Sequence, residues 1–318
     1  MLNLLAIGIG AGLVSALLFG VVITGSPLAM LLSVVAPLPI FIAALGWNHL
    51  AGLVAALAGG LAMAAALNLT AGFAFALGWA LPAWWLAYLA LLGRPNASGQ
   101  TEWYPLGRLL LWLAATAALI TFLGLLAIGD GSLEAFRTNL RGLLEAALQP
   151  TDAQTPSGAT TPSEAINFLA GALPFFFAVN FVLILTLNLW LAGKTVQVSG
   201  RLPRPWPDIP STTMPSVSLI ALAGSVVVAF APGLLGAGGM ILTGAFLASF
   251  LLQGLAFVHD TTRHRPARGL LLGGLYALTL LLSQVTMPLL AILGCADVAF
   301  ALRNRFRPGA AGPKPPSP

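Results

Sequence analysis

The stretch MLNLLAIGIGAGLVSALLFG, residues 1–20, contains no charged side chain, and no Asp, Glu, Lys or Arg precedes Arg94. An apolar run of about 20 residues forms a helix long enough to cross roughly 30 Å of hydrocarbon. The run lacks the basic start and the small-residue cleavage site of a secretory signal. We therefore expect it to be a retained first membrane span.

The composition of the whole chain extends this prediction. Of 318 residues, 58% are hydrophobic and 7% are charged, whereas soluble domains carry about 25% charged residues. The mean hydropathy is +0.93. Apolar segments recur at 2–24, 27–46, 50–67, 71–92, 108–128, 164–193, 215–233, 238–258, 269–284 and 286–302. The pattern predicts an all-α, polytopic transmembrane helical bundle with nine or ten spans.

The uncertainty in the number of spans lies in residues 269–303. A single helix over this range would be about 50 Å long. Polar Ser283, Gln284 and Thr286 precede Pro288, and together they favour a turn that divides the range into two spans.

One segment between the spans has a different pattern. In SLEAFRTNLRGLLEAAL, residues 132–148, Leu133, Phe136 and Leu140 share a helical face, and the charged residues lie mostly opposite. We expect an amphipathic interfacial helix. The predicted organisation is N-terminal transmembrane helices at 1–128, an extracytoplasmic amphipathic helix with a flexible loop at 129–163, C-terminal transmembrane helices at 164–308, and a disordered tail at 309–318.

Basic residues set the expected orientation. The net charge of +5 comes from clusters that follow the fourth, sixth and eighth segments and end the chain: Arg94 and Arg108; Lys194, Arg201 and Arg204; Arg263, Arg265 and Arg268; Arg303, Arg305, Arg307 and Lys314. With ten spans all four clusters fall on one side, which the positive-inside rule assigns to the cytoplasm together with both termini. Membrane lipids, rather than nucleic acid, are the expected partner of this charge.

Motifs for catalysis are missing from the sequence. There is no nucleotide-binding G-x-x-x-x-G-K-[ST] loop, no H-E-x-x-H, no G-x-S-x-G and no pair of carboxylates within a span. Cys295 is the single cysteine, and no Cys/His cluster has the spacing of a metal site. We therefore expect no enzyme activity, no catalytic residue, no metal and no cofactor.

Polar and aromatic residues in apolar surroundings are the candidates for a binding site. AALGWNHLAGL, residues 43–53, places Asn48 and His49 between apolar runs, and ALGW occurs at 44–47 and again at 76–79. Polar groups are costly in lipid and mark either a cavity or contacts between helices. The predicted ligand-binding residues are Trp47, His49, Trp79, Asn180 and Gln253. The alternative is structural: an interfacial turn and belt for the first three, and inter-helix hydrogen bonds for the two amides.

Two other features leave alternatives open. Gly8 and Gly12 form a small-x-x-x-small pair, which allows close helix packing either inside the bundle or against a partner membrane protein. Asp297 lies six residues before Arg303, where a structural pair or a proton relay is compatible with the pattern.

A family resemblance is carried by APLPIFIAALGW (36–47), LPAWWLAYLALL (81–92), RPAR (265–268) and LLAILGCADVAFALRNR (289–305). With these motifs the chain resembles the YybS-like family of predicted bacterial membrane proteins of unknown function. That family is similar to the substrate-binding S components of energy-coupling-factor transporters, although S components usually have six spans. The resemblance implies a bacterial inner-membrane protein that binds or moves a small, largely apolar solute and has no ATPase of its own. No site residue is carried over from it. The alternative function is a non-catalytic membrane scaffold or assembly factor.

Overall fold

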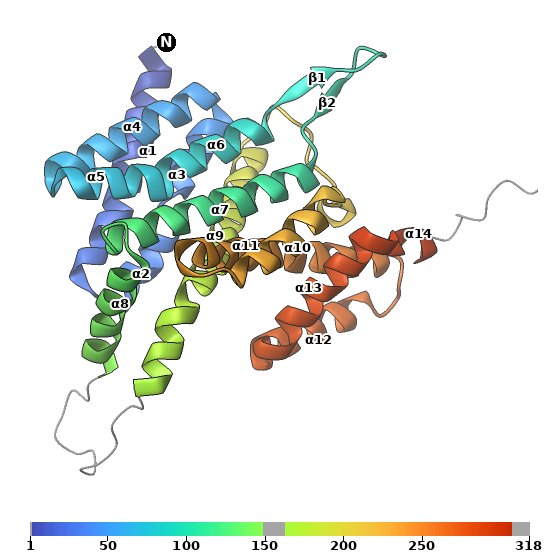
Figure 1. Cartoon of the computed structure of the whole chain (residues 1–318). Helices are drawn as coiled ribbons and strands as arrows, with labels where there is room; N and C mark the ends of the chain where they lie inside the picture. The colour runs from blue at the N-terminus through green and yellow to red at the C-terminus, as the bar shows by residue number, and fades with distance from the viewer. Residues whose placement is uncertain (1, 149–162, 307–318) are drawn as a thin grey trace, which may run out of the picture.

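The computed structural model describes residues 2–148 and 163–306. Helices form nearly all of this part of the chain (Figure 1), which confirms the predicted all-α bundle. The flexible stretch expected after the amphipathic helix and the tail expected at 309–318 lie outside the described residues.

The first half of the bundle is built from short helices joined end to end. These are α1 (Leu2–Gly20), η1 (Val21–Thr24), α2 (Pro27–Val34), α3 (Leu38–Gly46), α4 (His49–Ala66), α5 (Leu69–Phe75), the π-helical η2 (Ala76–Ala80) and α6 (Leu81–Ala90). The sequence did not indicate the antiparallel hairpin that follows, β1 (Gly93–Pro95) and β2 (Thr101–Trp103).

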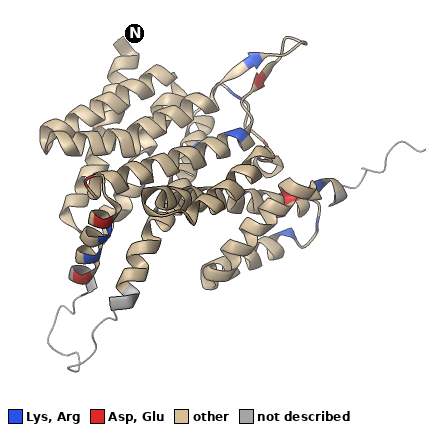
Figure 2. Cartoon of the chain, viewed as in Figure 1, with Lys and Arg blue, Asp and Glu red and all other residues tan. Residues whose placement is uncertain are grey.

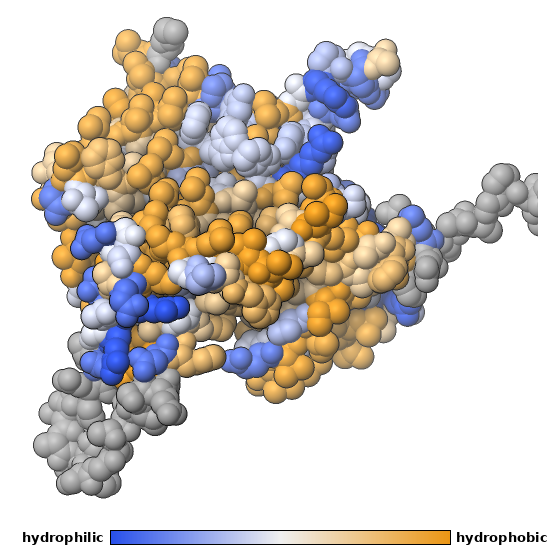
Figure 3. Space-filling model, viewed as in Figure 1, coloured by the Kyte–Doolittle hydropathy of each residue, from blue (hydrophilic) through white to orange (hydrophobic). Residues whose placement is uncertain are grey.

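The second half contains the longest helices. These are α7 (Leu106–Ile128), α8 (Leu133–Leu148), α9 (Ser163–Val198), η3 (Ile209–Ser211), α10 (Val217–Ala229), α11 (Gly233–Thr261), α12 (Arg268–Leu281), α13 (Ser283–Phe300) and α14 (Leu302–Phe306). The amphipathic helix is present as α8, with Phe136 and Leu140 buried and Arg137 and Arg141 exposed. Figure 3 shows its hydrophilic surface beside the largely apolar face of the bundle.

Each of the ten predicted apolar segments contains a helix, but the expected number of spans was too high by the criterion of length. Among the described residues, eight helices or joined helices are long and apolar enough to cross a membrane. The other two segments form α10 and α12, of 13 and 14 residues, which rise only about 20 Å. The last apolar stretch does divide in two, but at Leu282, and Pro288 lies inside α13.

The second span is broken in its middle. Helix α2 ends at Val34 and α3 begins at Leu38, next to Pro37. The break frees backbone carbonyls, and two neighbouring helices supply donors to them. Ser15 Oγ of α1 donates to the Ala36 carbonyl, and Asn188 Nδ2 of α9 donates to the Val34 carbonyl at 2.9 Å. Irregular backbone at membrane depth is stable when neighbouring helices satisfy it in this way.

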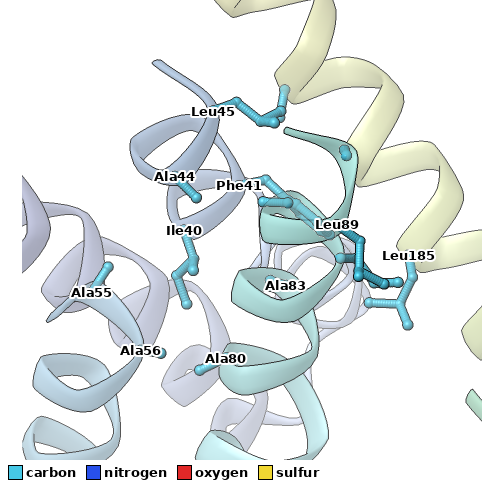
Figure 4. Close-up of a cluster of buried hydrophobic side chains, with 14 of the residues drawn as sticks. Ile40, Phe41, Ala44, Leu45, Ala55, Ala56, Ala80, Ala83, Leu89 and Leu185 are labelled. Atoms are coloured by element: carbon cyan, nitrogen blue, oxygen red, sulfur yellow. The ribbon is translucent and has the colours of Figure 1, made fainter. Parts of the chain in front are cut away.

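Two buried clusters hold the helices together. In the first, shown in Figure 4, Ile40 and Phe41 of α3 pack among α4, α6 and Leu185 of α9. The second joins α7, α9 and α11 largely through alanines, such as Ala117, Ala178 and Ala245. Small side chains let helix backbones approach closely where lipid provides no hydrophobic drive for association.

Apart from Arg137 and Arg141 of α8, the basic residues that the structure describes gather at one end of the bundle. Gly8 and Gly12 of α1 lie against Ala51 and Ala55 of α4, so the two helices run in the same direction and start at this end. The loop between α9 and α10, the hairpin and α14 gather there too, and the middle lengths of the helices carry almost no charge (Figure 2). The compartment that this end faces stays a prediction.

Candidate functional site

The five residues predicted to bind a ligand do not come together around one cavity. Trp47 ends α3, and its ring lies under the Arg201 guanidinium, 4.7 Å from the ring centroid. Trp79, in η2, packs against Phe181 with the ring centroids 5.4 Å apart. Asn180 is exposed on α9, whereas Gln253 is completely buried in α11.

The turn around His49 follows the structural alternative. Asn48 caps α4, its Oδ1 accepting a hydrogen bond of 3.1 Å from the Leu50 amide. The His49 ring lies 5.1 Å from that of Tyr88. Its Nδ1 is buried with no hydrogen-bond partner among the described residues. The residues from 46 to 49 thus mark a boundary between two helices, as the turn interpretation predicted.

The two asparagines of α9, Asn180 and Asn188, differ in burial because they do not share a helical face. Residues eight positions apart are rotated by about 80° around an α-helix. Asn188 faces α3 and the break in the second span and is completely buried. Asn180 is turned outward as a result. In the described chain, the inter-helix hydrogen bond that the structural interpretation predicted for Asn180 is made by Asn188 instead.

Gly8 and Gly12 of α1 pack against α4 of the same chain. A β-carbon at Gly8 would lie 2.8 Å from the Ala51 carbonyl oxygen, and one at Gly12 would overlap the Ala55 carbonyl oxygen. Contacts this short are possible only for glycine. Both residues serve packing inside the bundle, and binding of a partner protein through them stays an untested prediction.

A largely apolar cavity lies elsewhere in the described chain, between α7, α9 and α11. It has a volume of about 490 Å³ and is also lined by residues 202–212 of the loop between α9 and α10. The lining extends from Leu106 to Leu113 on α7, from Gly193 to Thr186 on α9, and from His259 to Leu252 on α11. Each range spans about two turns, so the cavity runs roughly 10 Å along the bundle.

The walls are divided by polarity. The inner part is formed mainly by leucines, and Thr186 there donates its hydroxyl to the Val182 carbonyl of its own helix at 2.7 Å. Arg204, Trp206 and His259 line the outer end, where the loop crosses. The lining includes no Asp, Glu or Cys. Such a space fits a molecule with an apolar body and a polar group at one end.

Arg204 is the principal polar group of this end. Its Nη1 donates to the Ala90 carbonyl, the C-terminal residue of α6, at 2.7 Å. Its Nε is buried without a hydrogen-bond acceptor in the described chain. Burial lowers the pKa of the guanidinium from the ordinary arginine value, because desolvation disfavours the charged form.

Trp206 forms the adjoining part of the wall. Its ring packs against Gly193 of α9. Lys194 Nζ lies above the same ring, 3.8 Å from the centroid. A cation over an indole face is an attractive arrangement, and it fixes the tryptophan at the mouth of the cavity.

Helix α12 contributes the last wall residue. Tyr276 Oη lies 2.9 Å from Nε2 of His259 in α11, and both residues line the cavity. Helix α12 has no buried residue of its own. This hydrogen bond therefore connects a loosely packed helix to the cavity.

The loop over the cavity is fixed from the C-terminal helices. Arg263 Nη2 lies 2.5 Å from Asp208 Oδ1, Arg303 Nη1 donates to the Pro210 carbonyl at 2.6 Å, and Gln253 Oε1 accepts from the Met214 amide at 3.1 Å. Gln253 therefore has a structural role, since its hydrogen bond holds the end of the loop. The three contacts also hold Arg204 and Trp206 in a defined place.

Asp297 belongs to the same polar network. It is 2% exposed, and its Oδ2 accepts from Arg303 Nε at 2.7 Å and from Gln253 Nε2 at 2.6 Å. This is the paired arrangement that the sequence left open beside a proton relay. In the described part of the chain, no group of three or more His, Cys, Asp or Glu side chains could hold a metal ion.

Sequence reasoning missed the cavity and Arg204. The signal was in RLPRPWPDIP, residues 201–210, where prolines enclose a cation and a tryptophan between two apolar segments. Read from the sequence alone, these arginines indicate only topology. A proline-rich loop is stiff, and stiffness is what a loop needs in order to position side chains over a cavity.

A family model described as predicted membrane protein (DUF2232) matches residues 13–298. No curated protein and no solved structure matches the chain. The matched range includes every wall of the cavity.

Proposed function

Since the chain belongs to the DUF2232 family of predicted membrane proteins, we propose that it binds a small, largely apolar molecule within its helical bundle. The observation that carries the proposal is the cavity of about 490 Å³ between α7, α9 and α11. Cavities that bind small molecules commonly measure about 300–1,000 Å³ and are mostly apolar with few polar groups.

The packing of the three helices supports a cavity that persists without a ligand. Below it, alanines bring α7, α9 and α11 into close contact. Above it, the loop is fixed by its contacts with Arg263, Arg303 and Gln253. Because the cavity walls are already fixed at both ends, the protein loses little conformational entropy when a ligand enters. This small cost favours binding.

The resemblance to YybS-like proteins, and through them to transporter S components, agrees with a binding protein that lacks its own ATPase. Movement of the solute across a bacterial inner membrane, with both termini in the cytoplasm, belongs to the same proposal. For the scaffold alternative we find no specific observation in its favour, since Gly8 and Gly12 contact α4.

A cavity-filling variant tests the binding function. Leu255 of α11 lines the cavity, and Leu255→Trp would occupy part of its volume. Leu242→Trp is the matched control, because Leu242 lies on the same helix but is 37% exposed on the outside. The purified protein is placed in lipid nanodiscs and incubated with radiolabelled decanol, decyl phosphate or decyltrimethylammonium.

The measured quantity is saturable probe retention above that of empty nanodiscs. We expect retention of at least one probe by the wild type and Leu242→Trp, and a loss of at least tenfold in affinity for Leu255→Trp. The proposal is wrong if none of the three probes is retained saturably, or if Leu255→Trp binds as well as the control.

A further inference from the structure

The charges at the mouth of the cavity are not balanced. None of the carboxylates that the structure describes lies within ion-pair distance of Arg204, whereas Arg263 and Arg303, on the other side of the loop, are each paired with aspartates. Lys194, on the Arg204 side, is held by the Gln197 amide oxygen at 2.9 Å and by the Trp206 ring. Two cations therefore stand at the mouth without a described anion.

The position of Arg204 makes this imbalance costly. The side chain is half-buried, and its Nε has lost contact with water without gaining an acceptor. An unpaired charge that is partly removed from water destabilises the folded protein. The Arg204 side chain is not free to turn toward water. It is held by the Ala90 carbonyl and lies beside the Trp103 ring, with its guanidinium carbon 5.7 Å from the ring centroid.

From this geometry we infer that the molecule bound in the cavity is an amphipathic anion, whose phosphate or carboxylate group pairs with Arg204 while its apolar body occupies the leucine-lined part. This inference rests on the proposed binding function and specifies its ligand class. Arginine is suited to the role because its planar guanidinium donates paired hydrogen bonds to carboxylate and phosphate oxygens.

A second polar group supports the same end of the cavity. Thr212 lines the cavity and is 8% exposed, and its Oγ1 has no hydrogen-bond partner among the described residues. Buried hydroxyls are nearly always hydrogen-bonded. Both unpartnered groups, Arg204 Nε and Thr212 Oγ1, come from the one loop that crosses the mouth, and the inner walls contain none.

The test compares probes that share a tail and differ in the head. In nanodiscs, the wild type binds decyl phosphate at least tenfold more tightly than decanol, and decyltrimethylammonium more weakly than either. Arg204→Gln reduces the preference for decyl phosphate to less than threefold and leaves decanol binding unchanged. Arg204→Lys, which keeps the charge, restores at least part of the preference.

Arg201→Gln is the matched control. Arg201 lies on the same loop but stacks on Trp47 and does not line the cavity, so its loss leaves the preference intact. Inorganic phosphate alone competes weakly, because it has no apolar body. Effective competition by inorganic phosphate would show that the site takes a free anion, and it would overturn the amphipathic assignment.

The two proposals fail in different ways. Equal affinities for decanol and decyl phosphate in the wild type contradict the anionic head and leave the binding function standing. Absence of saturable retention for every probe contradicts the binding function itself. The wild-type comparison needs no variant, so the inference is testable even if Arg204→Gln does not fold.

Discussion

Arg303 reaches back over the end of α13 to Asp297, with Nε 2.7 Å from Oδ2. Between them Ala301 adopts a left-handed conformation, with φ of 48°. This conformation ends α13, and the short α14 that follows contacts both α11 and α13. Both partners of the ion pair are nearly inaccessible to solvent, at 2% and 6% exposure.

Removal of either partner should destabilise the protein strongly. Asp297→Asn leaves the Arg303 guanidinium buried without its nearest anion. Arg303→Gln leaves the Asp297 carboxylate without a cation, with only the Gln253 amide and the backbone amide of residue 303 as donors. Breaking a buried pair on one side costs about 3–5 kcal/mol. We expect a large drop in the thermal unfolding midpoint of each single variant in detergent.

The double variant Asp297→Asn/Arg303→Gln should be less destabilised than the sum of the two singles, since neither charge is then left alone. Arg94→Gln is the control, because the Arg94–Glu102 pair on the hairpin is exposed on both sides and surface pairs contribute little. Additive effects at positions 297 and 303 would contradict the coupling.

Substitution of Ala301 by glycine should have the opposite effect on stability. A residue with a β-carbon is strained at positive φ by about 1–2 kcal/mol, and glycine is not. Ala301→Gly should therefore raise the unfolding midpoint or leave it unchanged, despite the greater freedom of glycine in the unfolded chain. Ala301→Val, which adds a β-branch at the same φ, should lower the midpoint. A stabilised valine variant would argue against this turn conformation.

The crossing of α11 and α13 depends on two glycines. A β-carbon at Gly254 would overlap the Leu290 carbonyl oxygen, and one at Gly294 would overlap that of Phe250. Gly254→Ala must push the helices apart, and overpacking of this kind costs about 1–3 kcal/mol. We expect a lower unfolding midpoint, and weaker decyl phosphate binding if Gln253 releases the Met214 amide.

Gly273→Ala supplies the comparison. No atom would lie within 4 Å of a β-carbon there, and alanine favours the helix over glycine by roughly 1 kcal/mol. That variant should be as stable as the wild type or more so. If Gly254→Ala behaves in the same way, α11 and α13 do not cross where the structure places them.

The helices could be predicted from the sequence because an apolar run in this chain has one simple interpretation. Residues 2–24 and 109–128 are almost entirely apolar, and within lipid a helix satisfies their backbone hydrogen bonds inside the segment itself. The lengths of α10 and α12 could not be predicted, because α10 packs mainly on α11 and α12 on α13, and the sequence does not show where this packing ends each helix.

The site was harder to predict because polar residues in an apolar chain have two uses. Gln253, Asn188 and Asp297 satisfy backbone or each other, and their sequence context resembles that of a ligand residue. In the sequence Arg204 is one of several loop cations, and its distance from the carboxylates of the described residues becomes apparent only in the folded chain. Contacts of this kind join residues more than a hundred positions apart, as Arg204 and Ala90 show.

Asn188 offers a final test, of the broken second span. Its Nδ2 donates to the carbonyls of Val34 and Ile184, each at 2.9 Å. Asn188→Leu keeps the volume and removes the donor, so the part-buried Val34 carbonyl loses its hydrogen bond from α9. Such a loss costs about 1–3 kcal/mol, although single inter-helix hydrogen bonds in membranes average roughly 0.6 kcal/mol. We expect a lower unfolding midpoint for Asn188→Leu and an unchanged one for Asn180→Leu, since Asn180 is exposed on the same helix. Equal effects of the two substitutions would show that the break between α2 and α3 does not depend on α9.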